Sequence, residues 1–288
     1  MKTKPKILVL KTEGTNCDEE TAFAFSLIGG DPQIVHVNEL RNKKENLKNY
    51  NILAIPGGFS YGDDIVSGKI LAVELTSFFS RELKKFIERK DTLIIGICNG
   101  FQVLIRTGLL PFRTIGKMKA TLTNNDSGHF ECRWVNLRIE PNSKCVFLNG
   151  LNTSDGGRLN ESNAMTPRRW IVSFQVAHGE GKFFAQKNII DKIEKENLVA
   201  LRYVDDNGKL TQKYPENPNG SLQAIAGICD TTGRILGLMP HPERFVRIEQ
   251  HPNWRRMVIK KPFTRRSFSE GGQGLPIFEN MIKYIQQL

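Results

Sequence analysis

The feature that most constrains the fold is a series of short apolar runs that alternate with turn residues and helical segments. In the amino-terminal part these runs are residues 7–10, 33–37, 51–55 and 92–97. Runs of this length fit buried strands, and the segments between them carry apolar residues at helical spacing. Strands that alternate with helices pair as a parallel sheet covered on both faces. We therefore expect an α/β fold with a mostly parallel, doubly wound central sheet.

Two helices can be placed between these strands. The first is expected to begin at Asn16, whose side chain can cap it, and to end near Ile28, before a Gly-Gly-Asp-Pro turn. The second spans residues 69–89 and is expected to pack on the core. Its apolar residues are Leu71, Leu75, Phe78, Phe79, Leu83, Phe86 and Ile87.

The carboxy-terminal half has strand-like runs without long helices between them, at residues 134–139, 170–176, 198–204 and 224–229. This pattern predicts an antiparallel extension of the same domain. We assign residues 1–250 to this domain, with 149–169 as an insertion. Residues 251–288 are assigned to a basic extension that ends in a helix. The apolar face of that helix, expected to pack on the body, consists of Ile277, Phe278, Met281, Ile282, Tyr284 and Ile285.

Composition excludes several classes of protein. The apolar content of 39% is enough for a core, and no apolar run approaches the ~20 residues of a membrane-spanning helix. The first residues do not resemble a signal peptide, so we expect a cytoplasmic location and no membrane partner. The five cysteines are odd in number and lack CxxC spacing, so we expect neither a disulfide framework nor a metal site.

The formal net charge of +11 favours anionic partners and is concentrated near the carboxy terminus. Residues 250–269 contain no acidic residue, and their six basic residues are Arg255, Arg256, Lys260, Lys261, Arg265 and Arg266. Such a run is typical of a solvated, partner-facing segment. The alternative is nucleic-acid binding, but the run lacks a recognised fold motif, so we expect no nucleic-acid partner.

Cys98 is the cysteine with a chemical signature. It lies between a strand-like run and a helical run, in Gly-Ile-Cys-Asn-Gly (96–100). Small residues on both sides permit the sharp strand-to-helix turn of a nucleophile elbow. The helix N-terminus behind it favours the thiolate and can hold a developing oxyanion. We therefore interpret Cys98 as a nucleophile.

A thiol nucleophile needs a general base, and His241 is the best placed of the five histidines. It stands in Met-Pro-His-Pro-Glu-Arg (239–244), just after another apolar run. Glu243 could accept the Nδ1 proton of His241 and fix its tautomer. The sequence thus predicts a Cys98–His241–Glu243 triad.

The third element is Pro-Gly-Gly-Phe-Ser-Tyr-Gly-Asp (56–63), which follows the third strand-like run. A Gly-Gly turn lets backbone N–H groups approach a substrate carbonyl. The N–H groups of Gly58 and Asn99 would then form a two-donor oxyanion hole. Taken alone, this segment is also an ordinary turn.

Together, these three motifs resemble class I glutamine amidotransferases, and more narrowly the glutaminase subunits of phosphoribosylformylglycinamidine synthase. Segments 124–133, 177–181 and 217–227 fit the narrower group, and the likeness covers roughly residues 6–248. The resemblance implies a Rossmann-like, three-layer α/β domain. It also implies that glutamine is hydrolysed to glutamate through a thioester on Cys98. Gly57, Phe59, Ser60 and Gln102 would bind glutamine.

The same resemblance implies that ammonia passes to a synthetase subunit, which uses ATP to convert formylglycinamide ribonucleotide to the amidine in purine biosynthesis. We expect no cofactor in this chain, because it has no phosphate-binding loop motif; ATP and Mg²⁺ would bind the partner. Whether a small third subunit takes part stays open. So does the role of His178, whose plainer interpretation is a loop histidine at the partner interface.

Two alternatives to this function remain. Another class I amidotransferase, or a free-standing γ-glutamyl hydrolase, would use the same Cys–His–Glu chemistry. A nucleic-acid-binding protein would instead use the basic run and show no glutaminase activity.

Overall fold

The computed structural model describes residues 4–151, 171–259 and 271–288. Its centre is a nine-stranded sheet of order β2-β1-β3-β4-β11-β10-β9-β6-β7. The first five strands in this order run parallel to one another. They are β1 (Lys6–Lys11), β2 (Asp31–His36), β3 (Ile52–Ile55), β4 (Leu93–Ile97) and β11 (Ile235–Leu238). The expected parallel core is confirmed, with strand ends within two residues of the predicted ones.

The other four strands extend this sheet in antiparallel pairings. They are β6 (Glu131–Ile139), β7 (Ile171–His178), β9 (Val199–Val204) and β10 (Ile225–Cys229). The predicted antiparallel extension is therefore confirmed, and it belongs to the same sheet. A separate ribbon of β5 (Ala120–Thr123) and β8 (Lys182–Ala185) was not predicted. Its strands are too short to give a clear apolar period.

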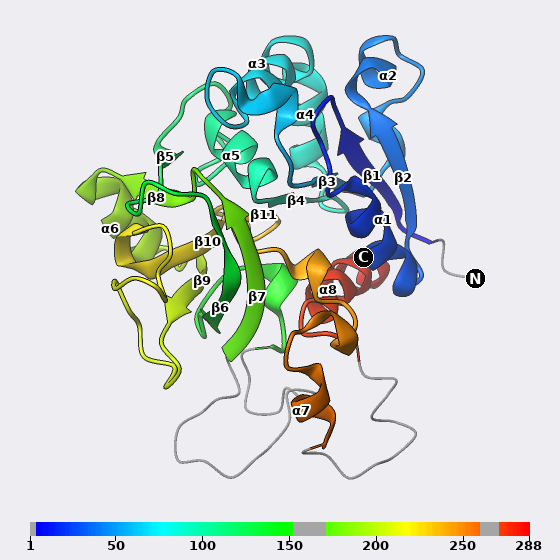
Figure 1. The fold of residues 1–288 in the computed structure, drawn as a ribbon. Coiled ribbons are helices and arrows are strands. Elements are labelled where there is room, and N and C mark those ends of the chain that lie inside the picture. The colour runs from blue at the N-terminus through cyan, green and yellow to red at the C-terminus, as the bar shows by residue number, and fades with distance from the viewer. Residues whose placement is uncertain (1–3, 152–170, 260–270) are drawn as a thin grey trace.

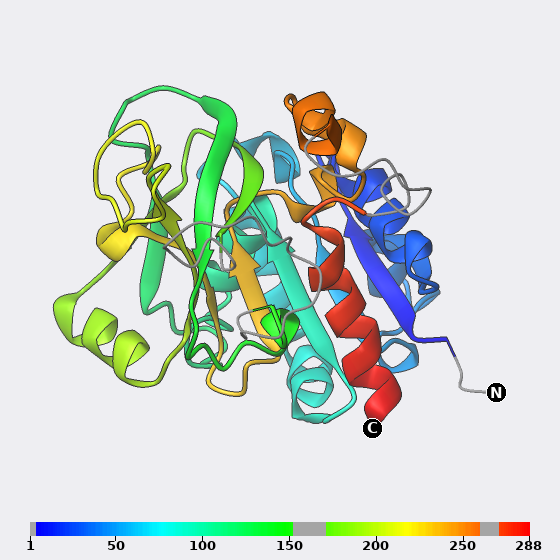
Figure 2. The same ribbon diagram turned by 90° about the horizontal axis from the view of Figure 1, so that it is seen from below.

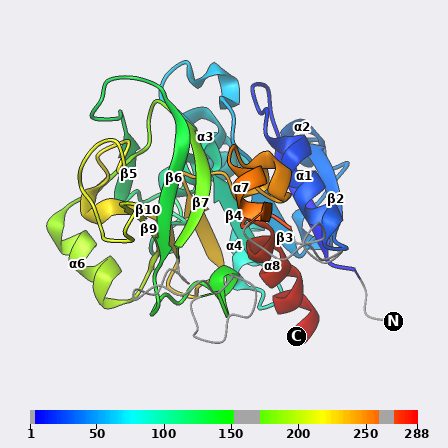
Figure 3. The same cartoon turned by 60° about the horizontal axis from the view of Figure 1, so that its bottom comes forward.

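Helices cover both faces of the sheet and make three layers (Figure 1). Helices α3 (Lys69–Phe78), α4 (Ser80–Glu88) and α5 (Asn99–Arg106) lie on one face. Helices α1 (Asp18–Leu27) and α8 (Leu275–Gln287) contact each other on the opposite face. Figures 2 and 3 show α8 running along the sheet beside the amino-terminal elements. The remaining helices are α2 (Val37–Arg41), α6 (Lys187–Lys195) and α7 (Trp254–Ile259).

The terminal helix packs into the main core, as its apolar face predicts. Ile277, Phe278, Met281 and Ile282 are buried, and Phe278 meets Phe25 of α1 edge-on, with ring centroids 5.0 Å apart. Most of the predicted insertion at 149–169 lies outside the described residues, and so does the basic run from residue 260. Within the described ranges, no helix is long and apolar enough to cross a membrane.

Two local predictions about helices are wrong. The single helix expected over 69–89 is two helices, separated at Phe79, whose backbone (φ −118°, ψ 11°) leaves the helical region and whose ring is buried. Phe78 is consequently 60% exposed instead of in the core, with the Arg41 guanidinium 4.7 Å from its ring centroid. Asn16 does not cap α1 either. The helix begins at Asp18, so Cys17 holds the capping position, and no side chain makes a capping hydrogen bond there.

The topology brings four loops to one edge of the sheet. Strands β1, β3, β4 and β11 are neighbours and parallel, so the segments that follow them emerge at the same edge. Those segments are residues 12–17, the Pro-Gly-Gly loop 56–63, Cys98, and residues 239–244. In open α/β sheets this edge is where ligands bind.

Candidate active site

Cys98 occupies a strained turn between β4 and α5. Its backbone angles are φ +53° and ψ −106°, outside the regions that non-glycine residues favour. The flanking glycines make the turn possible. A Cβ on Gly96 would lie 2.5 Å from the Gly100 carbonyl oxygen, and one on Gly100 would lie 1.9 Å from the Ile55 carbonyl oxygen. The predicted elbow is therefore present, and the spacing of both glycines is explained by close packing of α5 on β3 and β4.

The thiol of Cys98 lies at the N-terminus of α5 and is almost fully buried. Its Sγ atom donates a hydrogen bond of 3.5 Å to the Ala177 carbonyl oxygen at the end of β7. Cys98 thus lies between the parallel half of the sheet, which carries it, and β7 of the antiparallel half, which it contacts.

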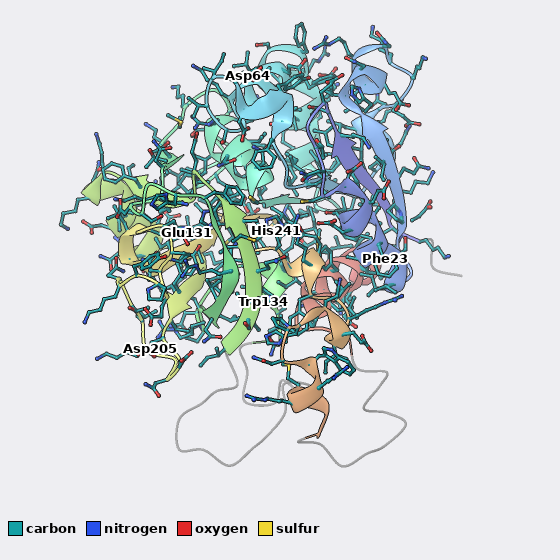
Figure 4. The ribbon with its side chains drawn as sticks, viewed as in Figure 1. Phe23, Asp64, Glu131, Trp134, Asp205 and His241 are labelled. Carbon is teal, nitrogen blue, oxygen red and sulfur yellow. The ribbon has the colours of Figure 1, made fainter. Side chains whose placement is uncertain are left out.

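His241 and Glu243 form a buried pair beside this thiol. His241 Nδ1 lies 2.5 Å from Glu243 Oε1, as predicted from their spacing. The backbone N–H of His241 donates to the Gln175 carbonyl oxygen of β7 (2.8 Å), which fixes the loop after β11. His241 is at the middle of the molecule in Figure 4, between Glu131 of β6 and Phe23 of α1.

The charges around His241 favour its protonated form. Burial by itself would lower the pKa of the imidazole, but the Glu243 carboxylate and the Cys98 sulfur raise it, with a contribution from Cys17. The net effect raises the pKa of His241 well above its ordinary value. An imidazole of this kind can take the Cys98 proton and hold it as an imidazolium next to Glu243.

The Pro-Gly-Gly loop is held against the loop after β1. Gly58 has φ +139°, and a Cβ there would lie 2.7 Å from the Gly14 carbonyl oxygen, so glycine is required on two grounds. Its neighbour Phe59 donates its N–H to the same Gly14 carbonyl (2.8 Å). Within the described chain, the N–H groups of Gly58 and Asn99 make no hydrogen bond. Both predicted oxyanion donors are therefore free to bind a substrate oxygen.

Gly57 lies where His241, Cys17 and Cys98 come together. A Cβ on this glycine would be 2.8 Å from His241 Cε1, 3.1 Å from Cys17 Sγ and 3.4 Å from Cys98 Cβ. The side chain of residue 57 must therefore be a single hydrogen for these groups to pack together.

The predicted glutamine-binding residues fall into two groups. Phe59 is 45% exposed at the edge of the site, with its ring 6.2 Å from that of Phe130, and Ser60 is buried with no described hydrogen-bond partner for its hydroxyl. Gln102 is instead engaged within the protein. It accepts from Asn99 Nδ2 (3.0 Å) and donates to the Glu180 carbonyl oxygen (2.6 Å).

These contacts of Gln102 belong to a chain of hydrogen bonds between two loops. Asn99 Nδ2 also donates to Asp63 Oδ1 (3.1 Å) in the Pro-Gly-Gly loop, while Glu180 lies in the 178–181 segment. Arg106 pairs with Glu180 at 3.7 Å and donates to the Ser67 carbonyl oxygen (2.8 Å). Side chains of α5 therefore connect the Pro-Gly-Gly loop to the residues at the end of β7.

His178 is not a surface loop residue. It is the last residue of β7, it is buried, and its Nδ1 lies 3.0 Å from Asn125 Oδ1. Burial and the nearby positive charge of His241 lower its pKa to about 3, so it is neutral at physiological pH. The interpretation of His178 as a loop histidine is wrong, because it belongs to β7 and its ring is buried within this chain. Its partners Asn125 and Asn219 lie in segments 124–133 and 217–227, which carry part of the resemblance to the amidotransferases.

Sequence reasoning missed Cys17 and Arg244. Cys17 Sγ accepts a hydrogen bond from Arg244 Nη2 (3.1 Å), and Arg244 Nε donates to Glu20 Oε1 (2.7 Å). The available signal was position, because Cys17 follows β1 and therefore lies at the same edge as Cys98 and His241.

Comparisons with known proteins agree with this site. A family model described as a CobB/CobQ-like glutamine amidotransferase domain matches residues 4–285. The chain is 43% identical over 286 residues to phosphoribosylformylglycinamidine synthase subunit PurQ of Dehalococcoides mccartyi, covering 99% of this chain and 100% of the relative. It is 37% identical to the PurQ subunit of Archaeoglobus fulgidus, covering 98% of each chain.

Among solved structures, a chain from the structure of PurLQS from Thermotoga maritima matches with a TM-score of 0.66 at 30% identity. The match covers 98% of this chain and 99% of that one. The three-layer amidotransferase fold and the resemblance expected from the motifs are thereby confirmed. The chain belongs to the family of phosphoribosylformylglycinamidine synthase PurQ subunits, within the glutamine amidotransferases.

Proposed function

We propose that this chain hydrolyses the side-chain amide of glutamine and delivers the ammonia to a synthetase subunit. That subunit would use ATP to convert formylglycinamide ribonucleotide to formylglycinamidine ribonucleotide, in purine biosynthesis. The observation that carries the proposal is the strained Cys98 elbow beside the buried His241–Glu243 pair. The names of the PurQ relatives support the choice of synthetase.

The proposed reaction begins with proton transfer from Cys98 Sγ to His241 Nε2. The thiolate attacks the amide carbon, and the N–H groups of Gly58 and Asn99 bind the oxygen as it becomes negative. The imidazolium then gives its proton to the leaving nitrogen, which departs as ammonia and leaves a glutamyl thioester on Cys98.

In the second half, His241 takes a proton from a water molecule that attacks the thioester carbon. The C–S bond breaks, glutamate leaves, and the thiolate regains its proton from the imidazolium. Glu243 stabilises each imidazolium and remains ionised throughout. The raised pKa of His241 supports this assignment, because the protonated form occurs twice in the cycle.

We assign the binding of glutamine to residues 57–60 of the Pro-Gly-Gly loop. Phe59 lies at the rim of the site, and the Ser60 hydroxyl is available as a hydrogen-bond partner. The role proposed for Gln102 is to hold this loop in register through Asn99 and Asp63. We propose no cofactor or metal for this reaction, since a thiol, a base and two N–H donors suffice. ATP and Mg²⁺ would act in the synthetase subunit, and the five unpaired cysteines suit a cytoplasmic location.

The test compares two ammonia sources in the assembled complex. Cys98→Ala should abolish synthesis from glutamine and leave synthesis from added ammonium salts near the wild-type rate. Glutamine-dependent synthesis by Cys98→Ala at the wild-type rate would disprove the nucleophile assignment. A matched variant, Cys132→Ala, changes an exposed thiol and should behave as wild type in both assays.

The free chain should be a poor glutaminase that the partner activates, because uncontrolled hydrolysis would waste ammonia. The hydrogen bonds that connect the Pro-Gly-Gly loop to Glu180 offer a route for this activation. An oxyanion donor displaced by ~1 Å can cost about a hundredfold in rate. Measuring glutaminase kcat/KM for the chain alone and in the complex decides the matter. Equal values would favour a free-standing γ-glutamyl hydrolase.

A further inference from the structure

A second thiol adjoins the catalytic histidine, and the proposed reaction does not use it. Cys17 is buried, and Gly57 lies beside both it and His241. A Cβ placed on Gly57 would be 3.1 Å from Cys17 Sγ and 2.8 Å from His241 Cε1. The sulfur is fixed on its other side, because Arg244 Nη2 donates to it (3.1 Å) and the thiol faces Asn16 Oδ1 (3.4 Å).

Cys17, His241 and Glu243 together have the composition of a metal site. Each offers one ligand atom, these three atoms lie within 4.8 Å of one another, and all three residues are buried. Two polar atoms of the cluster, His241 Nε2 and Glu243 Oε2, are buried without a hydrogen-bond partner in the described part of the chain. The cluster is thus enclosed by protein, and two of its polar atoms have no partner among the described residues.

The donor set selects for the type of cation. Sulfur, imidazole nitrogen and carboxylate oxygen are the ligands of Zn²⁺, whereas Mg²⁺ and Ca²⁺ prefer oxygen alone. Ligand atoms around tetrahedral Zn²⁺ are roughly 3.5 Å apart, so the three side chains would have to move by about 1 Å. Arg244, itself bound to Glu20 at 2.7 Å, already supplies the outer hydrogen bond that orients a metal-bound sulfur.

We propose that Cys17, His241 and Glu243 bind one Zn²⁺ ion, and that the bound ion inhibits the glutaminase. On binding, the Cys17 thiol and the His241 imidazolium each release one proton to solvent, and the thiolate, the neutral imidazole and the carboxylate then donate electron pairs to the metal. Because the imidazole lone pair is then engaged, His241 can no longer accept the Cys98 proton. The inhibition rests on the proposed function, but the binding does not.

Binding is tested first, on the full chain with Cys98→Ala, so that the nucleophile cannot contribute a ligand. Calorimetric titration should give one Zn²⁺ per chain, and Co²⁺ in its place should show thiolate-to-metal charge-transfer absorption. Adding Cys17→Ser or Cys17→Ala should remove that absorption and weaken Zn²⁺ binding at least about a hundredfold, since outer partners alone are worth 10–100-fold. Cys132→Ser, at an exposed thiol, is the matched control and should change neither.

Two results would overturn the site: Zn²⁺ affinity that Cys17→Ser and Cys17→Ala leave unchanged, or a Co²⁺ complex without thiolate absorption. Circular dichroism of each variant shows that it is folded, and two different replacements guard against one that is not.

Inhibition is tested second, by release of glutamate in the synthetase complex. Zn²⁺ should inhibit the wild type reversibly, with recovery on adding a chelator, and Mg²⁺ at the same concentration should not inhibit. Cys17→Ser should keep its own basal rate in the presence of Zn²⁺. If Zn²⁺ inhibits this variant as strongly as the wild type, the ion acts elsewhere and the proposal fails. If Zn²⁺ binds through Cys17 but the metal-free complex releases no glutamate, the site stands and the proposed function fails.

Discussion

Replacing Gly57 with alanine tests the geometry of the site without removing any catalytic group. No positive φ is required at this position, so alanine meets only the surrounding atoms. The added methyl carbon would lie 2.8 Å from His241 Cε1, whereas ordinary carbon–carbon contacts are about 3.5–4.0 Å. The imidazole, the methyl group or both must therefore shift by about 1 Å.

A shift of that size at a catalytic base costs roughly a hundredfold in rate. We therefore expect Gly57→Ala to lower glutamine-dependent kcat/KM about 10- to 100-fold, mainly through kcat. Overpacking of this kind costs about 1–3 kcal/mol in the free energy of unfolding, so the protein should remain folded. Ammonia-dependent synthesis by the complex should not change, because that reaction does not use His241.

Gly179→Ala is the matched control, because its added carbon would have one neighbour, Phe130 Cδ2, at 3.9 Å. Glutamine-dependent synthesis, ammonia-dependent synthesis and thermal unfolding are measured for both variants. Wild-type glutamine-dependent kcat/KM in a folded Gly57→Ala protein would refute the argument. It would mean that His241 does not act from the position described here.

Three further predictions concern the base, the loop and the core. Glu243→Gln should lower kcat. Because it removes the negative charge that raises the pKa of His241, it should also shift the acidic limb of the kcat/KM–pH profile to lower pH. An unshifted limb would show that the Glu243 charge does not raise this pKa. Asp63→Leu removes one of the two acceptors of Asn99 Nδ2, the other being Gln102 Oε1. It should reduce glutamine-dependent synthesis several-fold with ammonia-dependent synthesis intact, as a comparison of both rates would show. Phe278→Ala should lower the free energy of unfolding by about 3–5 kcal/mol in denaturant titration, while the exposed Phe78→Ala should cost less than about 1 kcal/mol.

The fold was predictable where the local pattern of apolar residues indicates the same element that the strand topology requires. Continuous apolar runs such as that of β4 predict buried strands, and parallel pairing then brings their carboxyl ends together. The positions of Cys98 and His241 were predictable from this rule, since Cys98 directly follows β4 and His241 lies three residues after the end of β11. The break at Phe79 was not predictable, because the apolar spacing at helical intervals continues across it.

The hydrogen-bond partners of the other buried polar residues were harder to predict than the grouping of Cys98, His241 and Glu243. Gln102 and His178 both carry groups that could bind a substrate, and their hydrogen-bond partners come from distant segments. Nothing in the local sequence shows that Glu180 and Asn125 satisfy them. Cys17 shows the same limit, because its proximity to His241 depends on the packing of the loop after β1 against Gly57.

The order of strands also governs when the site comes into existence during synthesis. Cys98 follows β4, which is made early, but His241 follows the neighbouring strand β11, which is made only after the whole antiparallel extension. The loop after β11 is also held by the residues just before α8, where Gly274 donates its N–H to the Phe245 carbonyl oxygen (2.8 Å). Long-range pairing of this kind forms late in folding. Cys98 is therefore synthesised well before His241, and the two side chains can come together only after all the strands between β4 and β11 in the sequence have been made.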